Sequence, residues 1–417
     1  MATGRVHIVG AGLAGLAAAV RLGAGSADVV LHEATDHAGG RCRSYFDAAL
    51  GMTIDNGNHL LLSGNRETLA YLESIGARDR LIGPAEATFD FADLADGGRW
   101  RLRLNDGRLP WWIFFAARRV PGSRPLDYLS AVRLLRAAGD VQIGDVLDRA
   151  SPLYARLWRP ILLAALNTEP EKASAGLAAA VMRETLFAGG RACRPLVAAD
   201  GLSGALIDPA LARLRGAGRH VRFGRRLRAI ELGPDRALGL DFGSEQIALG
   251  PEDRVILAVP PWVATSLLPE LAAPQEFRAI VNAHYRVEPP AGLPRILAVV
   301  NGQVEWLFAF EGRLSVTISG ADRLMDTDRE VLARELWAEV ARLTGLSEVL
   351  PAWQIVKEKR ATFAATPEQE RLRPGTQSRW RNLHLAGDWT ATGLPATIEG
   401  AIRSGFRAAD LARESRL

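Results

Sequence analysis

Cysteine and lysine are nearly missing from this chain. Its 417 residues include 2 cysteines, Cys42 and Cys193, which form neither a CxxC pair nor a metal-ligand spacing. A disulfide framework is therefore excluded, we expect no metal site, and a reducing cytoplasm fits. Lysine occurs only at Lys172, Lys357 and Lys359, so nearly every basic residue is an arginine.

Long apolar runs are also missing. No stretch of about 18 apolar residues is free of charge, so we expect no transmembrane helix. The apolar N-terminal stretch holds glycines that serve a phosphate loop, so we do not expect a signal peptide. No arginine block is interleaved with aromatic residues, which argues against nucleic acid as a partner. The net charge of +4 and the pI of about 9.4 allow a weak attraction to anionic lipid.

The rest of the composition is that of a large globular protein. Hydrophobic residues make up 48% and charged residues 24% of the chain, which is ordinary for a protein that buries a sizeable core. At this length two domains are expected.

The segment 6–33 is the strongest signal in the sequence. The apolar run 6–9 predicts a buried parallel strand, 13–22 an Ala/Leu-rich helix, and 29–31 a second strand. Strand and helix are joined by a GxGxxG sequence, formed by Gly10, Ala11, Gly12, Leu13, Ala14 and Gly15. This is the βαβ context that the dinucleotide-binding fingerprint requires, and the alternative is a glycine-rich turn without a ligand.

Each glycine of this loop has a physical role. Gly10 permits the tight turn, Gly12 lets the backbone approach a pyrophosphate, and Gly15 lets the helix pack closely on the sheet. The unpaired N–H groups at the helix start would face the phosphates. Glu33 follows at about the 20-residue spacing of the acid that binds a ribose hydroxyl, and its charge argues against NADP.

We also expect Ala34, next to Glu33, to contact the cofactor, and a second phosphate-type element follows a few residues later. Gly39 and Gly40 expose backbone N–H groups, and the Arg41 guanidinium can hold a pyrophosphate oxygen. Because it follows the ribose acid so closely, this element points to FAD rather than NAD.

A turn signal at 55–57 leads into a loop for which we predict cofactor contacts at Asn56, Gly57 and Asn58. His59 comes next, before an apolar run. A place beside the flavin ring and the role of a capping or core histidine are both open for this residue.

The segment 109–119 differs from its surroundings. It is too short to span a bilayer, and its aromatic residues are followed by an arginine pair, which suits a segment that lies in the membrane interface. The alternative is a core helix. The residues concerned are Trp111, Trp112, Phe114, Phe115, Arg118 and Arg119.

The C-terminal part supplies a partner for the N-terminal motifs. A strand at 383–386 is followed by Gly387, which permits close approach, and by Asp388, which can accept a hydrogen bond from a ribityl hydroxyl. A helix then starts near Pro395. Its first residues, Thr397 and Ile398, would face the flavin pyrimidine edge, where a helix N-terminus favours negative charge. An ordinary βα turn is the alternative.

Other parts of the chain give weaker signals. We predict a hairpin over 88–104, mostly helix over 126–190, a strand over 254–259, a sheet over 287–318 and an amphipathic helix over 329–343.

Three motifs carry a family resemblance: GAGLAGL with its following Glu33, GGRCRS, and LAGDWTATGLPATIEGAIRSG. Together they resemble the flavin-containing amine oxidase and phytoene desaturase superfamily over nearly the whole chain. Within it, DNGNHLLLSGN and LWRPILLAALN resemble the squalene-associated, FAD-dependent desaturase branch, the hydroxysqualene dehydroxylases of bacterial hopanoid synthesis.

The resemblance implies an α/β fold with a discontinuous, Rossmann-like FAD-binding domain of the GR2 flavoprotein type. That domain would comprise 1–85, 195–265 and 370–417, and an α+β substrate domain would comprise 86–194 and 266–369. A long apolar tunnel would run between the two domains.

The resemblance also implies the reductive removal of the hydroxyl of hydroxysqualene to give squalene. The partners would be an apolar isoprenoid substrate, an electron donor that stays unidentified, and the inner membrane as a peripheral contact. FAD would be non-covalent, because no cysteine follows Cys193. For the proton donor we favour His59 over His284.

Three other functions stay open. A carotenoid-type, phytoene-like desaturase is one. A flavin amine oxidase is the second, although the expected lysine is missing from 282–286. A prenyl-lipid carrier without flavin is the third, against which the complete set of cofactor motifs argues.

Overall fold

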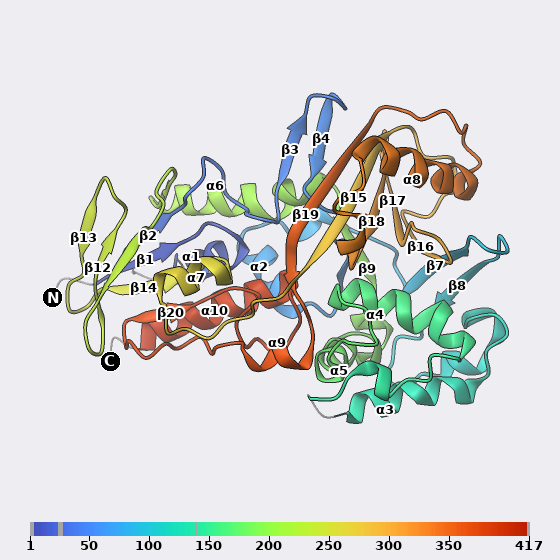
Figure 1. Cartoon of the computed structure of the whole chain (residues 1–417), viewed down its shortest axis with the longest axis horizontal. Coiled ribbons are helices and arrows are strands. Elements are labelled where there is room, and N and C mark those ends of the chain that lie inside the picture. Colours follow the sequence, from blue (N-terminus) through green and yellow to red (C-terminus); the bar gives the residue numbers. More distant parts are fainter. Residues whose placement is uncertain (1–3, 24–27, 138–139, 415–417) are drawn as a thin grey trace.

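The computed structural model describes residues 4–23, 28–137 and 140–414. Figure 1 shows a parallel sheet at one end of the molecule, a larger sheet toward the other end, and a group of helices beside the larger sheet. Within these ranges no helix has the length and apolar character needed to cross a membrane.

The parallel sheet is assembled from distant parts of the chain. Its strand order is β10-β2-β1-β14-β20, and every neighbouring pair is parallel. Most side chains of β1, β2, β14 and β20 are apolar and buried, as expected for parallel strands covered on both faces, although His7, His32 and His384 are buried there too. The strands are β1 (Arg5–Val9), β2 (Asp28–His32), β10 (Val221–Arg222), β14 (Arg254–Leu257) and β20 (Leu383–Leu385).

Two helices from opposite ends of the chain cover one face of this sheet. α1 (Leu13–Gly23) and α10 (Ile398–Glu414) pack against each other. They can do so because Gly405 has no side chain: a Cβ there would overlap the Ala14 carbonyl. On the other face, a small antiparallel sheet places Phe242 in the same apolar cluster as Leu257. Its strands are β11 (Ala229–Leu232), β12 (Ala237–Asp241) and β13 (Gln246–Ala248).

The larger sheet has seven strands in the order β19-β15-β18-β17-β16-β7-β8. Helix α8 (Arg329–Thr344) packs on one face, and α3 (Ser130–Arg136), α4 (Arg159–Leu166) and α5 (Ala175–Glu184) belong to the apolar cluster on the other. The strands are β7 (Thr88–Asp93), β8 (Arg99–Arg103), β15 (Phe277–Arg286), β16 (Ile296–Val300), β17 (Trp306–Phe310), β18 (Arg313–Ile318) and β19 (Trp353–Phe363).

Shorter elements connect the two sheets. They are the hairpin β3 (Ser44–Asp47) and β4 (Met52–Asp55), the strands β5 (Leu61–Leu62), β6 (Leu81–Ile82) and β9 (Pro195–Ala198), and the helices α2 (Arg66–Ser74), α6 (Asp208–Gly216), α7 (Pro261–Leu267) and α9 (Pro367–Arg371).

The predicted fold class is confirmed, and so are the βαβ unit, the hairpin β7–β8 and helix α8. The prediction of mostly helix over 126–190 is only partly correct. A π-helical turn at Tyr154–Trp158 and short 3-10 turns interrupt this segment, and Pro160 at the start of α4 cannot donate a helical hydrogen bond. Strands β15 and β19 were not predicted.

The proposed division into two domains stays a prediction. All strands of the parallel sheet fall within the segments assigned to the FAD-binding domain, and all strands of the larger sheet fall within those assigned to the substrate domain.

Candidate functional site

The two glycine loops that the sequence singles out lie side by side. The Gly39 N–H donates to the Ala11 carbonyl at 2.8 Å, and Gly12 and Gly39 form a parallel β-bridge. A Cβ added to Gly12 would meet no atom within 4 Å, and one added to Gly40 would lie 3.6 Å from the Gly12 Cα. The backbone at Gly12 and Gly40 is therefore open to a ligand at the start of α1, which fits a phosphate group. We refer to this backbone surface as the glycine ledge.

The other two glycines of the loop are required by packing. Gly10 has a positive φ of +104°, and a side chain there would collide with the Ala258 carbonyl at the end of β14. A side chain on Gly15 would collide with the Gly10 carbonyl. The side chains of Leu13 and Ala14 are buried in α1, so these residues can offer only backbone groups to a ligand.

Glu33 lies at the end of β2, beside the glycine loop. Its Oε2 accepts a hydrogen bond from the Ala11 N–H at 2.8 Å, and its Oε1 accepts from the Thr35 N–H and hydroxyl at 2.9 Å each. The carboxylate therefore lies next to the glycine loop, where it could contact the adenosine part of a dinucleotide. Ala34, which follows it, is exposed.

A third segment, for which the sequence patterns predicted no part in the cofactor site, lies at this position. The Glu33 N–H donates to the Arg222 carbonyl at 3.0 Å, and the Arg225 N–H donates to the Glu33 carbonyl at 2.7 Å. The loop after β10 thus encloses the acid. The strand-like Val221-Arg222 followed by Gly224 was the available signal, since a third parallel strand normally lies beside the second in this kind of sheet.

Arg41 and Asp388 form an ion pair that joins the N-terminal and C-terminal motifs. Arg41 Nη2 donates to both carboxylate oxygens at 2.7 Å each, and Nη1 donates to the Ala361 carbonyl at 2.5 Å. The Asp388 side chain is 9% exposed and that of Arg41 is 42% exposed. We predicted separate partners for these two residues, a pyrophosphate and a ribityl hydroxyl. The structure adds that the two side chains contact each other. To take the predicted roles, each would have to bind its part of FAD while it keeps the ion pair, or exchange the ion pair for that contact.

Two hydrogen bonds fix the start of α10 and the residue before Asp388. The Gly387 N–H donates to Ser404 Oγ at 2.8 Å, and the Thr397 hydroxyl accepts the Gly400 N–H at 3.0 Å as a helix cap. The Ile398 side chain is buried. Thr397 and Ile398 can therefore present only backbone groups to a flavin.

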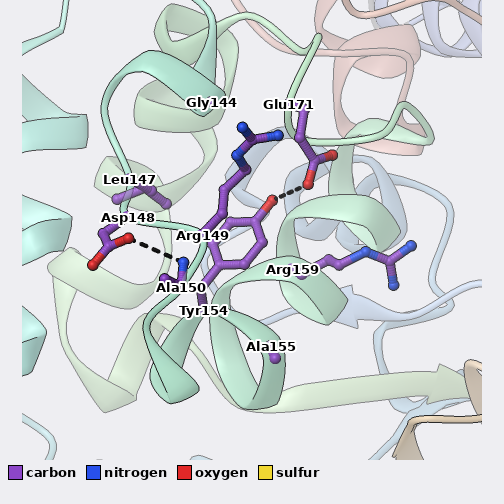
Figure 2. A pocket seen from close by; sticks show the side chains of 9 residues that line it. All are labelled: Gly144, Leu147, Asp148, Arg149, Ala150, Tyr154, Ala155, Arg159 and Glu171. Carbon is purple, nitrogen blue, oxygen red and sulfur yellow. Dashed lines mark hydrogen bonds between the residues drawn. The ribbon is translucent and has the colours of Figure 1, made fainter.

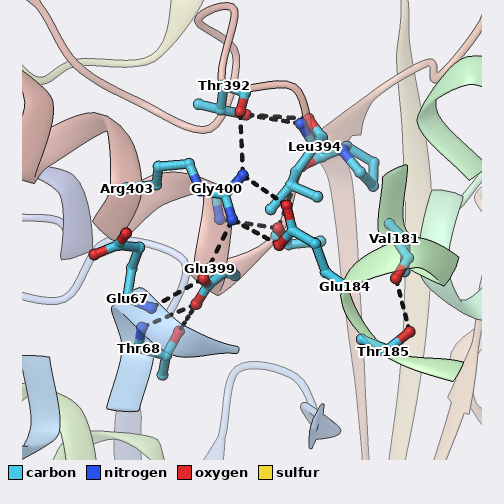
Figure 3. Close-up of polar contacts among 12 residues, drawn as sticks. Glu67, Thr68, Val181, Glu184, Thr185, Thr392, Leu394, Glu399, Gly400 and Arg403 are labelled. Carbon is cyan, nitrogen blue, oxygen red and sulfur yellow. Dashed lines mark hydrogen bonds and ion pairs between the residues drawn. The ribbon is translucent and has the colours of Figure 1, made fainter. Parts of the chain in front are cut away.

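A polar network fixes α10 to its neighbours (Figure 3). Buried Glu399 accepts the backbone N–H groups of Glu67 and Thr68 at 3.0 and 2.9 Å, and so caps the N-terminus of α2. One turn later, Arg403 forms a two-pronged ion pair with Glu184 at the end of α5, at 3.1 and 2.7 Å. The network ties the helix that follows Asp388 to both α2 and α5.

The loop that carries His59 follows β4 and lies against the larger sheet. Asp55, at the end of β4, accepts the Ser44 hydroxyl at 2.6 Å and the Leu202 N–H at 2.8 Å, which fixes the start of the loop. Burial lowers the pKa of His59 to about 4; Asp55 acts in the opposite direction and Arg41 in the same direction. His59 is therefore a neutral imidazole at neutral pH.

His284 lies inside the larger sheet. It is fully buried in β15, and its Nδ1 is 2.8 Å from the Ser315 hydroxyl of β18. Burial, and then the positive charge of Arg313, lower its pKa to about 3. This environment is that of a core histidine and disfavours the role of proton donor. No observation tests that role directly, so it stays a prediction.

A hollow of about 780 Å³ opens in the helical region (Figure 2). The Tyr154 hydroxyl donates to Glu171 Oε1 at 2.8 Å on its wall, and none of the predicted cofactor residues lines it. The apolar tunnel that we expect between the two domains therefore stays a prediction.

The loops, the acid and the Arg41–Asp388 pair together fit a flavin nucleotide, and comparison with known proteins agrees. The model of the family "Flavin containing amine oxidoreductase" matches residues 13–412. The chain belongs to this family. It is a flavin-dependent oxidoreductase.

Proteins similar to this chain indicate which branch of the family it resembles most. The chain is 58% identical to the hydroxysqualene dehydroxylase of Rhodopseudomonas palustris over 407 residues, which cover 97% of each chain. It is 56% identical to the hydroxysqualene dehydroxylase of Sinorhizobium fredii, over 98% of each chain. Among solved structures, cyclohexylamine oxidase from Brevibacterium oxydans has the same fold, with a TM-score of 0.70, 18% identity and 99% of each chain covered.

Proposed function

We propose that this protein removes the hydroxyl group of hydroxysqualene reductively and releases squalene. The observation that carries the proposal is the full-length identity of 58% and 56% to proteins named hydroxysqualene dehydroxylase. The test is anaerobic incubation of the reduced protein with hydroxysqualene, followed by analysis for squalene. Squalene supports the proposal, and unchanged substrate refutes it.

The cofactor that we propose is non-covalent FAD, held through its pyrophosphate at the glycine ledge and through its ribose at Glu33. Bound in its reduced form, FAD would supply a hydride to the carbon that loses the hydroxyl. Burial raises the pKa of both cysteine thiols, Cys42 and Cys193, so neither is poised as a thiolate for covalent attachment. Release of yellow FAD by mild acid precipitation tests this assignment.

The chain must also protonate the leaving hydroxyl, and His59 is the proposed donor. Its lowered pKa means that only a small fraction carries the extra proton at pH 7. A negatively charged group bound near the imidazole would raise that pKa toward the working range. His284 is the second choice, because it is buried against Ser315.

We further propose that the protein binds peripherally to the inner membrane. Six large apolar side chains are exposed near the predicted interfacial segment: Leu109 80%, Trp111 46%, Phe114 68%, Phe115 53%, Leu126 74% and Leu129 54%. We refer to them as the apolar surface. A substrate as apolar as hydroxysqualene partitions into lipid, so contact with a bilayer would give access to it.

The structure changes which residues of that segment can reach lipid. Trp112 is 5% exposed and packs against Tyr128, so its predicted insertion is wrong. The two tryptophans lie next to each other on a 3-10 turn and therefore point in different directions. Arg118 lies over the Trp111 ring at 4.9 Å and can still face headgroups, whereas Arg119 donates to the Ile113 carbonyl at 2.7 Å.

The alternative functions have less support. A protein of Synechococcus elongatus named "Probable zeta-carotene desaturase" is only 24% identical to this chain. For an amine oxidase, the expected lysine is missing from β15, and Lys357 on the neighbouring strand β19 donates to the carbonyls of Leu324 and Met325 instead. For a carrier without flavin, the intact glycine ledge and the Glu33 carboxylate have no evident purpose.

A further inference from the structure

The loop 56–59 rests on the larger sheet through a group of buried amides. The Asn58 N–H donates to Asn282 Oδ1 at 3.3 Å, and Asn282 Nδ2 donates to the Asn56 carbonyl at 3.4 Å. Between them, a Cβ on Gly57 would lie only 3.1 Å from Asn282 Nδ2. The loop is therefore seated directly on the Asn282 side chain.

Asn282 is an unusual residue for the middle of a buried strand. It is 1% exposed in β15, where an amide is costly unless its hydrogen bonds are made. Its register partner on β18 is Thr317, whose hydroxyl donates to Asn282 Oδ1 at 2.7 Å. The same hydroxyl accepts from Asn58 Nδ2 at 3.0 Å. The two strand residues thus hold both the backbone and the side chain of the loop.

One acceptor of this group is left over. Asn58 Oδ1 is buried and has no hydrogen-bond partner among the residues that the structure describes. Buried polar atoms are nearly always paired, so this oxygen is available to an N–H or O–H group of a bound molecule. The loop is therefore fixed to the sheet and still holds one unpaired acceptor.

We propose that Asn282 and Thr317 are positioning residues, which hold the Asn56–His59 loop in place against the bound flavin and the substrate. The inference rests on the proposed function, in which this loop borders the reacting groups. Neither residue touches the reacting atoms. They link the loop to β15 and β18, and thus set its position relative to the sheet assigned to the substrate domain. Small displacements of such loops reduce rates strongly, by about 100-fold for 1 Å.

The experiment compares three variants of the FAD-loaded protein. Thr317→Val keeps the shape of the side chain and removes the hydroxyl, and Asn282→Leu removes the amide. The matched control is Tyr285→Phe, on the same strand but on the opposite face, which deletes the buried hydrogen bond from the Tyr285 hydroxyl to the Ala333 carbonyl (2.8 Å). The readouts are melting temperature, the visible circular dichroism of the bound flavin, and squalene formation.

We expect both Thr317→Val and Asn282→Leu to change the circular dichroism of the bound flavin. Turnover should fall by about 10-fold in Thr317→Val and by about 100-fold in Asn282→Leu. Tyr285→Phe should lower the melting temperature and leave both other readouts unchanged. If both loop variants alter only the melting temperature, as the control does, the proposal is overturned. Should Asn282→Leu fail to fold, Thr317→Val decides alone. The dichroism needs no substrate, so a changed spectrum without squalene formation in the parent protein supports the positioning role and refutes the proposed reaction.

Discussion

At the scale of single residues, the candidate cofactor site consists of groups that the chain holds in place before any ligand binds. Glu33 is fixed by the Ala11 N–H and by Thr35, and Arg41 is fixed by Asp388 and the Ala361 carbonyl. Preorganisation of this kind reduces the entropy that a bound cofactor must lose. Substitutions at these positions should therefore act on affinity more than on stability.

The first residue-scale prediction concerns cofactor affinity. Glu33→Ala should raise the dissociation constant of FAD by about 10- to 100-fold, because a hydrogen bond to a charged group contributes about 1.5–3 kcal/mol. Fluorescence titration of the apoprotein measures it. Glu73→Ala, which removes an exposed carboxylate of α2, is the control with the same change in charge. Unchanged affinity in Glu33→Ala would remove this residue from the cofactor site.

The second residue-scale prediction concerns the proton donor. His59→Ala should lower squalene formation by about 100-fold while FAD stays bound. Because the pKa of His59 is lowered to about 4, its protonated fraction grows as the pH falls from 7 toward 4. Turnover of the parent protein should rise over that range, and turnover of the variant should stay flat.

His220→Ala, at an exposed histidine, is the control for this experiment and should behave as the parent does. Near-normal turnover in His59→Ala would exclude His59. His284→Ala would then be the next variant to examine.

At the scale of elements, the apolar surface formed around Trp111 is the feature with the clearest consequence. Changing Trp111, Phe114 and Phe115 together to Ser should reduce co-sedimentation with anionic vesicles by at least about 10-fold, since each side chain loses apolar burial of about 1.5–3 kcal/mol. Phe46→Ser is the matched control: this residue lies on the hairpin β3–β4 and is 68% exposed, as is Phe114. Equal sedimentation of the triple variant and the control would contradict membrane contact through this surface.

Local sequence patterns predicted some of the helices and strands and missed others. The βαβ unit and the β7–β8 hairpin follow from local patterns, because glycine turns and apolar periodicity are encoded within a few residues. Strand β15 was missed because Asn282 and His284 stand in place of apolar residues on one of its two buried faces. Strand β19 was missed because the charged run 357–360 interrupts its alternation.

The candidate site divides in the same way. The glycine ledge and Glu33 were predicted because their spacing is local. The pairing of Arg41 with Asp388 bridges 347 positions and could not be read from local patterns. The seating of loop 56–59 on Asn282 depends in turn on a strand that was not predicted. Long-range contacts of this kind are set by the tertiary fold.

At the scale of the whole molecule, buried histidines link stability to pH. Burial is the main cause that lowers the pKa of five of them, to about 4 for His7, His59 and His384 and to about 3 for His32 and His284. The unfolded chain, with histidine pKa values near 6.5, binds more protons below that pH. Stability should therefore be complete above about pH 6.5 and decrease as the pH falls toward 4.

His384 offers the sharpest test of this linkage. It is 1% exposed, and its ring nitrogens have no hydrogen-bond partner among the described residues. Its contribution, lost between about pH 6.5 and 4, is on the order of 3 kcal/mol. Between pH 6.5 and 4, the free energy of unfolding, measured with urea, should decrease by about 3 kcal/mol less in His384→Leu than in the parent protein. The control His220→Leu, at an exposed histidine, should follow the parent protein. An unchanged slope in His384→Leu would contradict the assigned pKa.

At the same scale, we propose that the whole molecule removes the hydroxyl group of hydroxysqualene in a flavin-dependent reduction. A single-turnover experiment tests it most directly: the FAD-loaded protein is reduced anaerobically, freed of excess reductant and mixed with hydroxysqualene in detergent. We expect one squalene for each flavin that becomes oxidised, with the recovery of flavin absorbance and the appearance of squalene sharing one rate constant. Flavin that stays reduced in the presence of hydroxysqualene, with no squalene formed, would contradict the account.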